Sequence, residues 1–119
     1  MRTALIIDDS SFMRNWLKSI LESHSFKVIA ESNNGIDGIR KYSEHLPDIV
    51  LLDVVMPKMN DTSALEQLLL RHPEAKVIIC SSLADKQLID QCARLGAFDF
   101  VQKPNLNRIS DILAKIHNP

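Results

Sequence analysis

The chain has 119 residues, of which 45% are hydrophobic and 24% charged, enough apolar material for the core of one globular domain. Its formal net charge of −1 and isoelectric point near 6.4 argue against direct binding of nucleic acid or of an anionic membrane surface. No apolar run reaches the about 18 residues of a membrane span, and Met1 leads into a strand-like segment and not a signal peptide, so we expect one cytoplasmic domain over residues 1–119.

The first third of the chain predicts two strand–helix pairs. Residues 4–7 form an apolar strand that ends at Asp8-Asp9, and apolar residues at helical spacing follow it. Trp16 lies on this apolar stripe, so we expect its side chain in the core. Residues 26–30 form the second strand, and Asn33-Asn34-Gly35 mark the turn before the second helix.

The middle of the chain contains a lone carboxylate at the end of an unbroken apolar run. Residues 49–52 have the character of a strand covered on both faces, and Asp53 follows them directly. Met56-Pro57 stops the run. In the helix that comes next, Ser63 and Glu66 fit a capping box.

The last third predicts two further pairs. Residues 76–80 form a strand that ends at Ser81, and the next helix stops at Gly96, in the usual position after a helix. Residues 98–101 form the fifth strand, which ends at Lys103 before a last helix. Five alternations with short links indicate right-handed crossovers, and therefore an α/β fold with a parallel sheet and helices on both faces.

The two cysteines, Cys80 and Cys92, lie in apolar surroundings and lack metal-ligand spacing. We therefore expect buried free thiols and not a redox pair. Neither is assigned a function.

The carboxyl ends of parallel strands share one edge of the sheet, where ligands bind. Five side chains should meet there: Asp8, Asp9, Asp53, Ser81 and Lys103. Each alone has an ordinary structural role as a cap, a turn residue or a solvated charge. Together, three crowded carboxylates favour a hard divalent cation, and Mg²⁺ is the natural candidate. An aspartate can attack phosphorus while a metal, a lysine and a hydroxyl neutralise the transferring group, so the set predicts phosphoryl transfer.

These signatures resemble the receiver domain of two-component response regulators over essentially all 119 residues. The matching residues are Asp8-Asp9, Asp53 with Met56-Pro57 downstream, Ser81, and Lys103-Pro104. Segments 8–14 and 96–101 are most similar to the chemotaxis branch of that family, CheY and the receiver part of CheB. The resemblance implies a doubly wound five-stranded parallel sheet of order 2-1-3-4-5 with five helices, a flavodoxin-like fold.

The resemblance also implies roles for single residues. Asp53 would be the phosphoacceptor, and Ser81 and Lys103 would grip the phosphoryl group. The Mg²⁺ ligands would be Asp8, acting through water, Asp9, Asp53 and the backbone carbonyl of Val55. Such a domain is a signalling phosphoacceptor that assists its own phosphorylation and dephosphorylation. Its partners would be a sensor histidine kinase or phosphotransfer protein and a downstream protein target or output domain.

Four further features follow from the same resemblance. Phe100, together with Ser81, would form the conformational switch, and the peptide before Pro104 is usually cis. Val55 and Leu83 would flank the path of the hydrolytic water and tune dephosphorylation. Many receivers have Asp-Gly where this chain has Asn60-Asp61, which affects the loop conformation because Gly often supplies a positive φ there.

Three other functions share parts of this pattern. A magnesium-dependent phosphatase usually needs a second aspartate two residues after the nucleophile, where this chain has Val55. A flavodoxin-like cofactor module would offer backbone amides to a phosphate, whereas Asp8-Asp9 would repel it. A degenerate receiver used only for docking would have lost Asp53, Lys103 or one of the acidic pair, and none is lost.

Overall fold

The computed structural model describes residues 2–54 and 62–117, over which five strands alternate with five helices. The strands are β1 (Arg2–Ile7), β2 (Phe26–Ser32), β3 (Ile49–Leu52), β4 (Val77–Ser81) and β5 (Asp99–Gln102). The helices are α1 (Ser11–Ser23), α2 (Gly35–His45), α3 (Ser63–Arg71), α4 (Lys86–Leu95) and α5 (Asn107–His117). All four strand pairings are parallel and the order is β2-β1-β3-β4-β5, which confirms the predicted fold class.

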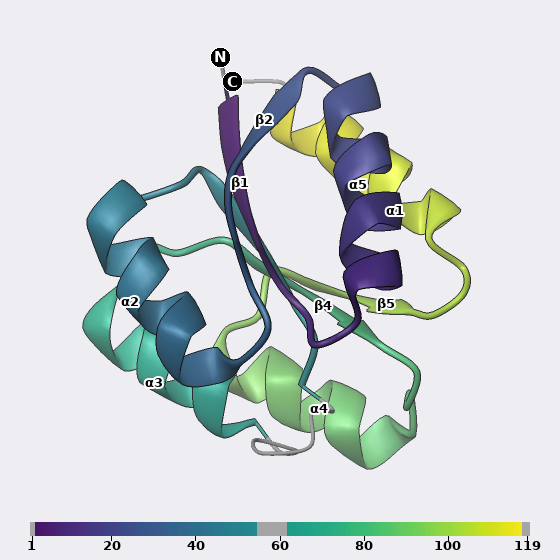
Figure 1. The fold of residues 1–119 in the computed structure, drawn as a ribbon. Helices are drawn as coiled ribbons and strands as arrows, with labels where there is room; N and C mark the ends of the chain where they lie inside the picture. The colour runs from purple at the N-terminus through teal and green to yellow at the C-terminus, as the bar shows by residue number, and fades with distance from the viewer. Residues whose placement is uncertain (1, 55–61, 118–119) are drawn as a thin grey trace.

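The sheet forms the middle of three layers. Figure 1 shows α1 and α5 on one face of it and α2, α3 and α4 on the other. Alternate residues of β3 supply the two cores, because Leu51 packs toward α1 and α5 whereas Val50 and Leu52 pack toward the opposite helices. Because both faces of β3 are covered, the strand has no polar residue. Asp53 therefore follows the last strand residue and does not lie within the strand.

Local signals in the sequence set where several helices begin and end. Ser10, Asn34 and Asp85 are the N-caps of α1, α2 and α4, and the side-chain oxygen of each accepts the N–H of the residue three positions later. Gly96 ends α4 with a φ of 108°, as predicted, because a residue with a Cβ is disfavoured in that conformation. Short-range contacts therefore fix where α1, α2 and α4 begin and where α4 ends.

The prediction that Trp16 lies in the core is wrong. Its side chain is 39% exposed and lies edge-on to the exposed ring of Phe12, with the ring centroids 6.1 Å apart. Leu17 and Leu21 are the residues of α1 that are fully buried. Successive helix residues are rotated by about 100°, so Trp16 projects about 100° away from Leu17 and about 140° away from Leu21, outside the stripe that these leucines define.

The predicted capping box at Ser63 and Glu66 is also wrong. The N-cap of α3 is Thr62, and Ser63 is already the first helical residue. The buried Thr62 hydroxyl makes no capping bond and accepts a hydrogen bond of 2.9 Å from the Gln91 side chain of α4. A contact between two helices has thus replaced the local cap.

Several smaller predictions are confirmed. Cys80 and Cys92 are buried free thiols, and burial raises the pKa of Cys80 to about 12 and also raises that of Cys92, which keeps both protonated at neutral pH. The Lys103-Pro104 peptide is cis. β4 and β5 each begin and end one residue later than predicted, so Ser81 is the last residue of β4. No helix in the described ranges has the length and apolar character needed to span a membrane.

Candidate functional site

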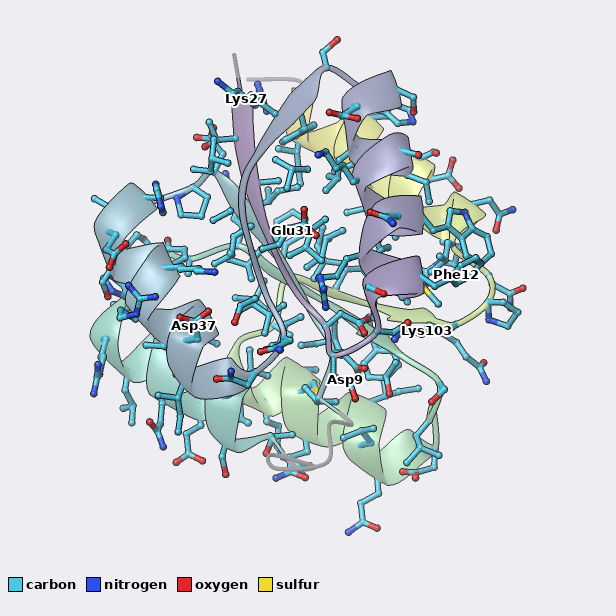
Figure 2. All side chains as sticks on the ribbon, viewed as in Figure 1. Asp9, Phe12, Lys27, Glu31, Asp37 and Lys103 are labelled. Atoms are coloured by element: carbon cyan, nitrogen blue, oxygen red, sulfur yellow. The ribbon has the colours of Figure 1, made fainter. Side chains whose placement is uncertain are left out.

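The polar residues that follow β1, β3 and β5 meet at the carboxyl end of the sheet. Asp8 and Asp9 continue β1, Asp53 continues β3 and Lys103 continues β5. Figure 2 shows Asp9 and Lys103 at this same end of the sheet. Residues more than 90 positions apart in sequence, such as Asp8 and Lys103, are in direct contact there.

Backbone hydrogen bonds hold the first residue after each strand. The N–H of Asp8 donates to the carbonyl of Ser32 at 3.0 Å, and the N–H of Asp53 donates to the carbonyl of Ile7 at 2.9 Å. The N–H of Lys103 donates to the carbonyl of Ser81 at 2.8 Å. The hydrogen bonding between neighbouring strands therefore continues one residue beyond each strand end. It fixes the backbone from which the side chains of Asp8, Asp53 and Lys103 project.

Lys103 bridges the two buried carboxylates. Its Nζ donates to Oδ2 of Asp8 at 2.7 Å and to Oδ2 of Asp53 at 3.2 Å, and its own side chain is only 12% exposed. Burial by itself lowers the pKa of Lys103, but the hydrogen bond to Asp8 and the charges of both carboxylates raise it more, so the pKa lies above its ordinary value. The ammonium group is consequently charged at neutral pH.

The acidic cluster holds more negative charge than Lys103 can neutralise. One oxygen from each of Asp8, Asp9 and Asp53 lies within 4.8 Å of the other two, and Asp9 is the exposed member. Two unit charges 4.8 Å apart repel by about 3 kcal/mol at an effective dielectric constant of about 20. Three carboxylates against one ammonium leave a net charge of −2, and carboxylate oxygens are preferred ligands of hard divalent cations. The donor set therefore fits Mg²⁺.

Ser81 is buried at the same end of the sheet as this cluster. It ends β4, between β3 and β5, and its hydroxyl accepts the N–H of Leu83 at 3.1 Å. No hydrogen bond among the described residues joins this hydroxyl to Asp53 or Lys103. Leu83 itself is 53% exposed, just beyond the turn.

Phe100 lies on β5 with its ring half-buried. It borders an open depression of about 410 Å³ on the surface formed by α4, β5 and α5. The lining residues are Ala84, Ile89, Asp99, Gln102, Asn105 and Arg108. Arg108 donates to the backbone carbonyl of Phe100 at 2.6 Å, which joins α5 to the strand at this point.

Some of the predicted features lie outside the described residues. They are the carbonyl of Val55, the Met56-Pro57 pair and Asn60-Asp61. Their roles stay predictions.

One contact to the acidic turn had no counterpart in the sequence analysis. Arg14, one turn into α1, donates from Nη1 to the backbone carbonyl of Asp8 at 2.6 Å. The N–H of Ser10 also donates to Oδ1 of Asp8, at 3.0 Å. A backbone carbonyl carries no residue-specific signal, so the pattern of side chains could not reveal the arginine contact.

Comparison with known proteins agrees with this geometry. The family model for the response regulator receiver domain matches residues 4–116. Chemotaxis protein CheY of Listeria monocytogenes is 40% identical over 116 residues, which cover 97% of this chain and 98% of that protein. A protein-glutamate methylesterase/protein-glutamine glutaminase of Oceanobacillus iheyensis is 39% identical over 104 residues, 86% of this chain but 30% of that protein. A chain in the crystal structure of the CheX–CheY–BeF₃–Mg²⁺ complex from Borrelia burgdorferi is 34% identical with a TM-score of 0.86, covering 93% of this chain and 88% of that one.

Proposed function

The chain belongs to the response regulator receiver family and is CheY-like, and from this premise we propose that it is a phosphorylation switch whose phosphoacceptor is Asp53. The donor would be a histidine kinase or a phosphotransfer protein. The phosphorylated form would act on a downstream protein target or output domain. The observation that carries the proposal is the convergence of Asp53, two further carboxylates and a buried ammonium group at the ligand-binding edge of the sheet.

The surroundings of Asp53 suit a nucleophile toward phosphorus. Its side chain is 6% exposed, so water competes little with an incoming phosphoryl group, and its Oδ2 is held by Lys103. An ionised carboxylate needs no general base to attack phosphorus, and the adjacent Lys103 ammonium group favours the ionised form of Asp53. Asp53 can therefore attack without a proton transfer, which agrees with the family's use of an aspartate.

The transfer itself forms one bond and breaks one. A carboxylate oxygen of Asp53 forms a bond to the phosphorus of a phosphohistidine, and the phosphorus–nitrogen bond breaks. The imidazole nitrogen leaves with the electron pair and takes a proton from water. Lys103 neutralises part of the charge on the phosphoryl oxygens, and Asp8, Asp9 and Asp53 would hold the Mg²⁺. When bound, Mg²⁺ supplies further neutralisation of those oxygens.

The signal would leave the site through Ser81 and Phe100. A phosphoryl group on Asp53 offers the Ser81 hydroxyl a charged acceptor, in place of its present contact with the N–H of Leu83. Movement of Ser81 would make room for Phe100 to turn from the depression on β5 into the protein. The change is a shift between two packings of one fold, and it would alter the surface that a protein partner binds.

The proposal is tested with acetyl phosphate, a small acyl phosphate donor. With Mg²⁺ the parent should gain one phosphoryl group, seen by intact-protein mass spectrometry, and Asp53→Asn should gain none. Asp111→Asn, which alters an exposed aspartate on α5, is the matched control and should be phosphorylated like the parent. Phosphorylation of Asp53→Asn at the parent's rate would overturn the assignment of the nucleophile.

A further inference from the structure

Arg14 connects the acidic turn after β1 to the end of β2. Its Nη1 donates to the carbonyl of Asp8 at 2.6 Å, and its Nε donates to Oε1 of Glu31 at 3.2 Å. The arginine side chain is only 20% exposed. Figure 2 shows Glu31 between β2 and α1, the position from which it holds the guanidinium group.

The carbonyl that Arg14 holds belongs to the peptide that joins Asp8 to Asp9. The other polar groups of Asp8 already have partners, because its N–H donates to Ser32 and its carboxylate accepts from Ser10 and Lys103. The Arg14 contact therefore fixes the one backbone group that orients the next residue.

Asp9 depends on this backbone contact more than its two neighbours do. Its carboxylate is exposed, and no hydrogen bond joins it to another residue in the described ranges, whereas Lys103 holds both Asp8 and Asp53. An oxygen of Asp9 lies within 4.8 Å of oxygens of the other two carboxylates, and like-charge repulsion disfavours this position. The direction of the Asp9 side chain is consequently set by its backbone and not by contacts of its own.

Glu31 is itself anchored to α2. The ammonium group of Lys41 donates to the backbone carbonyl of Glu31 and also pairs with Asp37 at 3.1 Å. Residues of β2 and α2 thus hold the guanidinium group that α1 carries. A planar group with several in-plane donors suits this double contact, since Nη1–H can serve the carbonyl while Nε–H serves the carboxylate.

We propose that Arg14, held by Glu31, is a positioning residue for the metal site, which fixes the Asp8-Asp9 peptide and so directs the Asp9 carboxylate toward a divalent cation. The inference rests on the proposed function, since that function supplies the metal. Arg14 would not touch the metal or the phosphoryl group. Its effect would pass through the backbone of Asp8.

An electrostatic effect of Arg14 and a positioning effect predict opposite changes in Mg²⁺ affinity when Arg14 is replaced. Arg14 adds a positive charge near a cation site, so by electrostatics alone its removal should tighten Mg²⁺ binding. If it positions Asp9, its removal should loosen the site, because loss of a supporting contact weakens metal binding by roughly 10-fold or more. The sign of the change therefore separates the two effects.

The experiment measures the Mg²⁺ dissociation constant of the metal-free protein by isothermal titration calorimetry. Arg14→Met should raise the constant by roughly 10-fold. Arg14→Lys keeps the charge but cannot reach both partners with one ammonium group, so it should also weaken binding. The matched control is Arg71→Met, which removes an exposed arginine from the last turn of α3, outside the Arg14 network, and should leave the constant unchanged.

A second readout needs no metal. Hydrogen exchange of the Asp9 amide in the metal-free protein should be faster in Arg14→Met than in the parent, because the peptide loses its anchor. Should Arg14→Met fail to fold, Arg14→Lys carries the same test with the charge retained.

The outcomes distinguish this inference from the proposed function. A parent that binds no Mg²⁺ overturns both. A parent that binds Mg²⁺, with Arg14→Met and Arg14→Lys binding it as tightly or more tightly, overturns the positioning role and leaves the metal site standing.

Discussion

Replacing Asp9 by asparagine should stabilise the metal-free protein and abolish most of its stabilisation by Mg²⁺. The substitution removes a negative charge but keeps the size and shape of the side chain. Oxygens of Asp8 and Asp53 lie within 4.8 Å of one of Asp9. Because Asp9 is exposed, its repulsion is screened to about 0.9 kcal/mol per neighbour at the dielectric constant of water, or about 1–2 kcal/mol over both.

Mg²⁺ should reverse the order of the two proteins. A ligand at a hundred times its dissociation constant stabilises the native state by about 2.7 kcal/mol when it does not bind the unfolded chain, which exceeds the repulsion that Asp9 adds. The parent should gain this amount, whereas Asp9→Asn should gain little. In thermal melts, 1–2 kcal/mol corresponds to roughly 3–8 °C for a domain of this size.

The assay is urea unfolding with and without Mg²⁺ at equal ionic strength. Asp111→Asn removes an aspartate from the exposed side of α5 and should respond to Mg²⁺ as the parent does. The reasoning is refuted if Asp9→Asn is less stable than the parent without metal, or if Mg²⁺ stabilises the two proteins equally.

Three other changes test the account. Lys103→Met should cost about 3 kcal/mol of unfolding free energy without metal, because it leaves two buried carboxylates without their partner; a urea midpoint equal to the parent's would contradict this. Hydrogen bonds from Arg40 and Lys41 hold the pKa of Asp37 at about 2, below the 3.8 of the unfolded chain, so its stabilisation is present above pH 3.8 and lost as the pH falls through about 2. Urea midpoints between pH 5 and pH 2 should therefore fall less steeply in Asp37→Asn than in the parent. The phosphorylated parent should decay slowly, because Val55 and Leu83 cannot orient a water molecule, and a Val55→Asn, Leu83→Glu double variant should lose radiolabel faster once the donor is removed.

The position of the candidate site could be predicted from the sequence because parallel strands impose it. An unbroken apolar run before Asp53 shows that the strand is covered on both faces, and the same holds for the run before Asp8. Once the sheet is parallel, residues that follow different strands must share one edge. The contacts of Lys103 with both aspartates agree with that reasoning.

The features that were missed depend on how elements pack against one another. Periodicity gives the direction in which Trp16 projects from its helix, but it does not show whether a neighbouring surface extends far enough to cover the ring. The hydroxyl of Thr62, the N-cap of α3, accepts from Gln91, a residue 29 positions away that local spacing does not reveal. The contact of Arg14 ends on a backbone carbonyl, which every residue type offers equally.

The most direct test of the central claim is to locate the phosphoryl group. Reduction of an acyl phosphate with borohydride converts the modified aspartate to homoserine, which peptide mass spectrometry can place in the sequence. After treatment with acetyl phosphate and Mg²⁺, we predict homoserine at position 53 alone. Homoserine at position 8 or 9, or a phosphoryl group that resists borohydride and is found on a serine or histidine, would contradict the account.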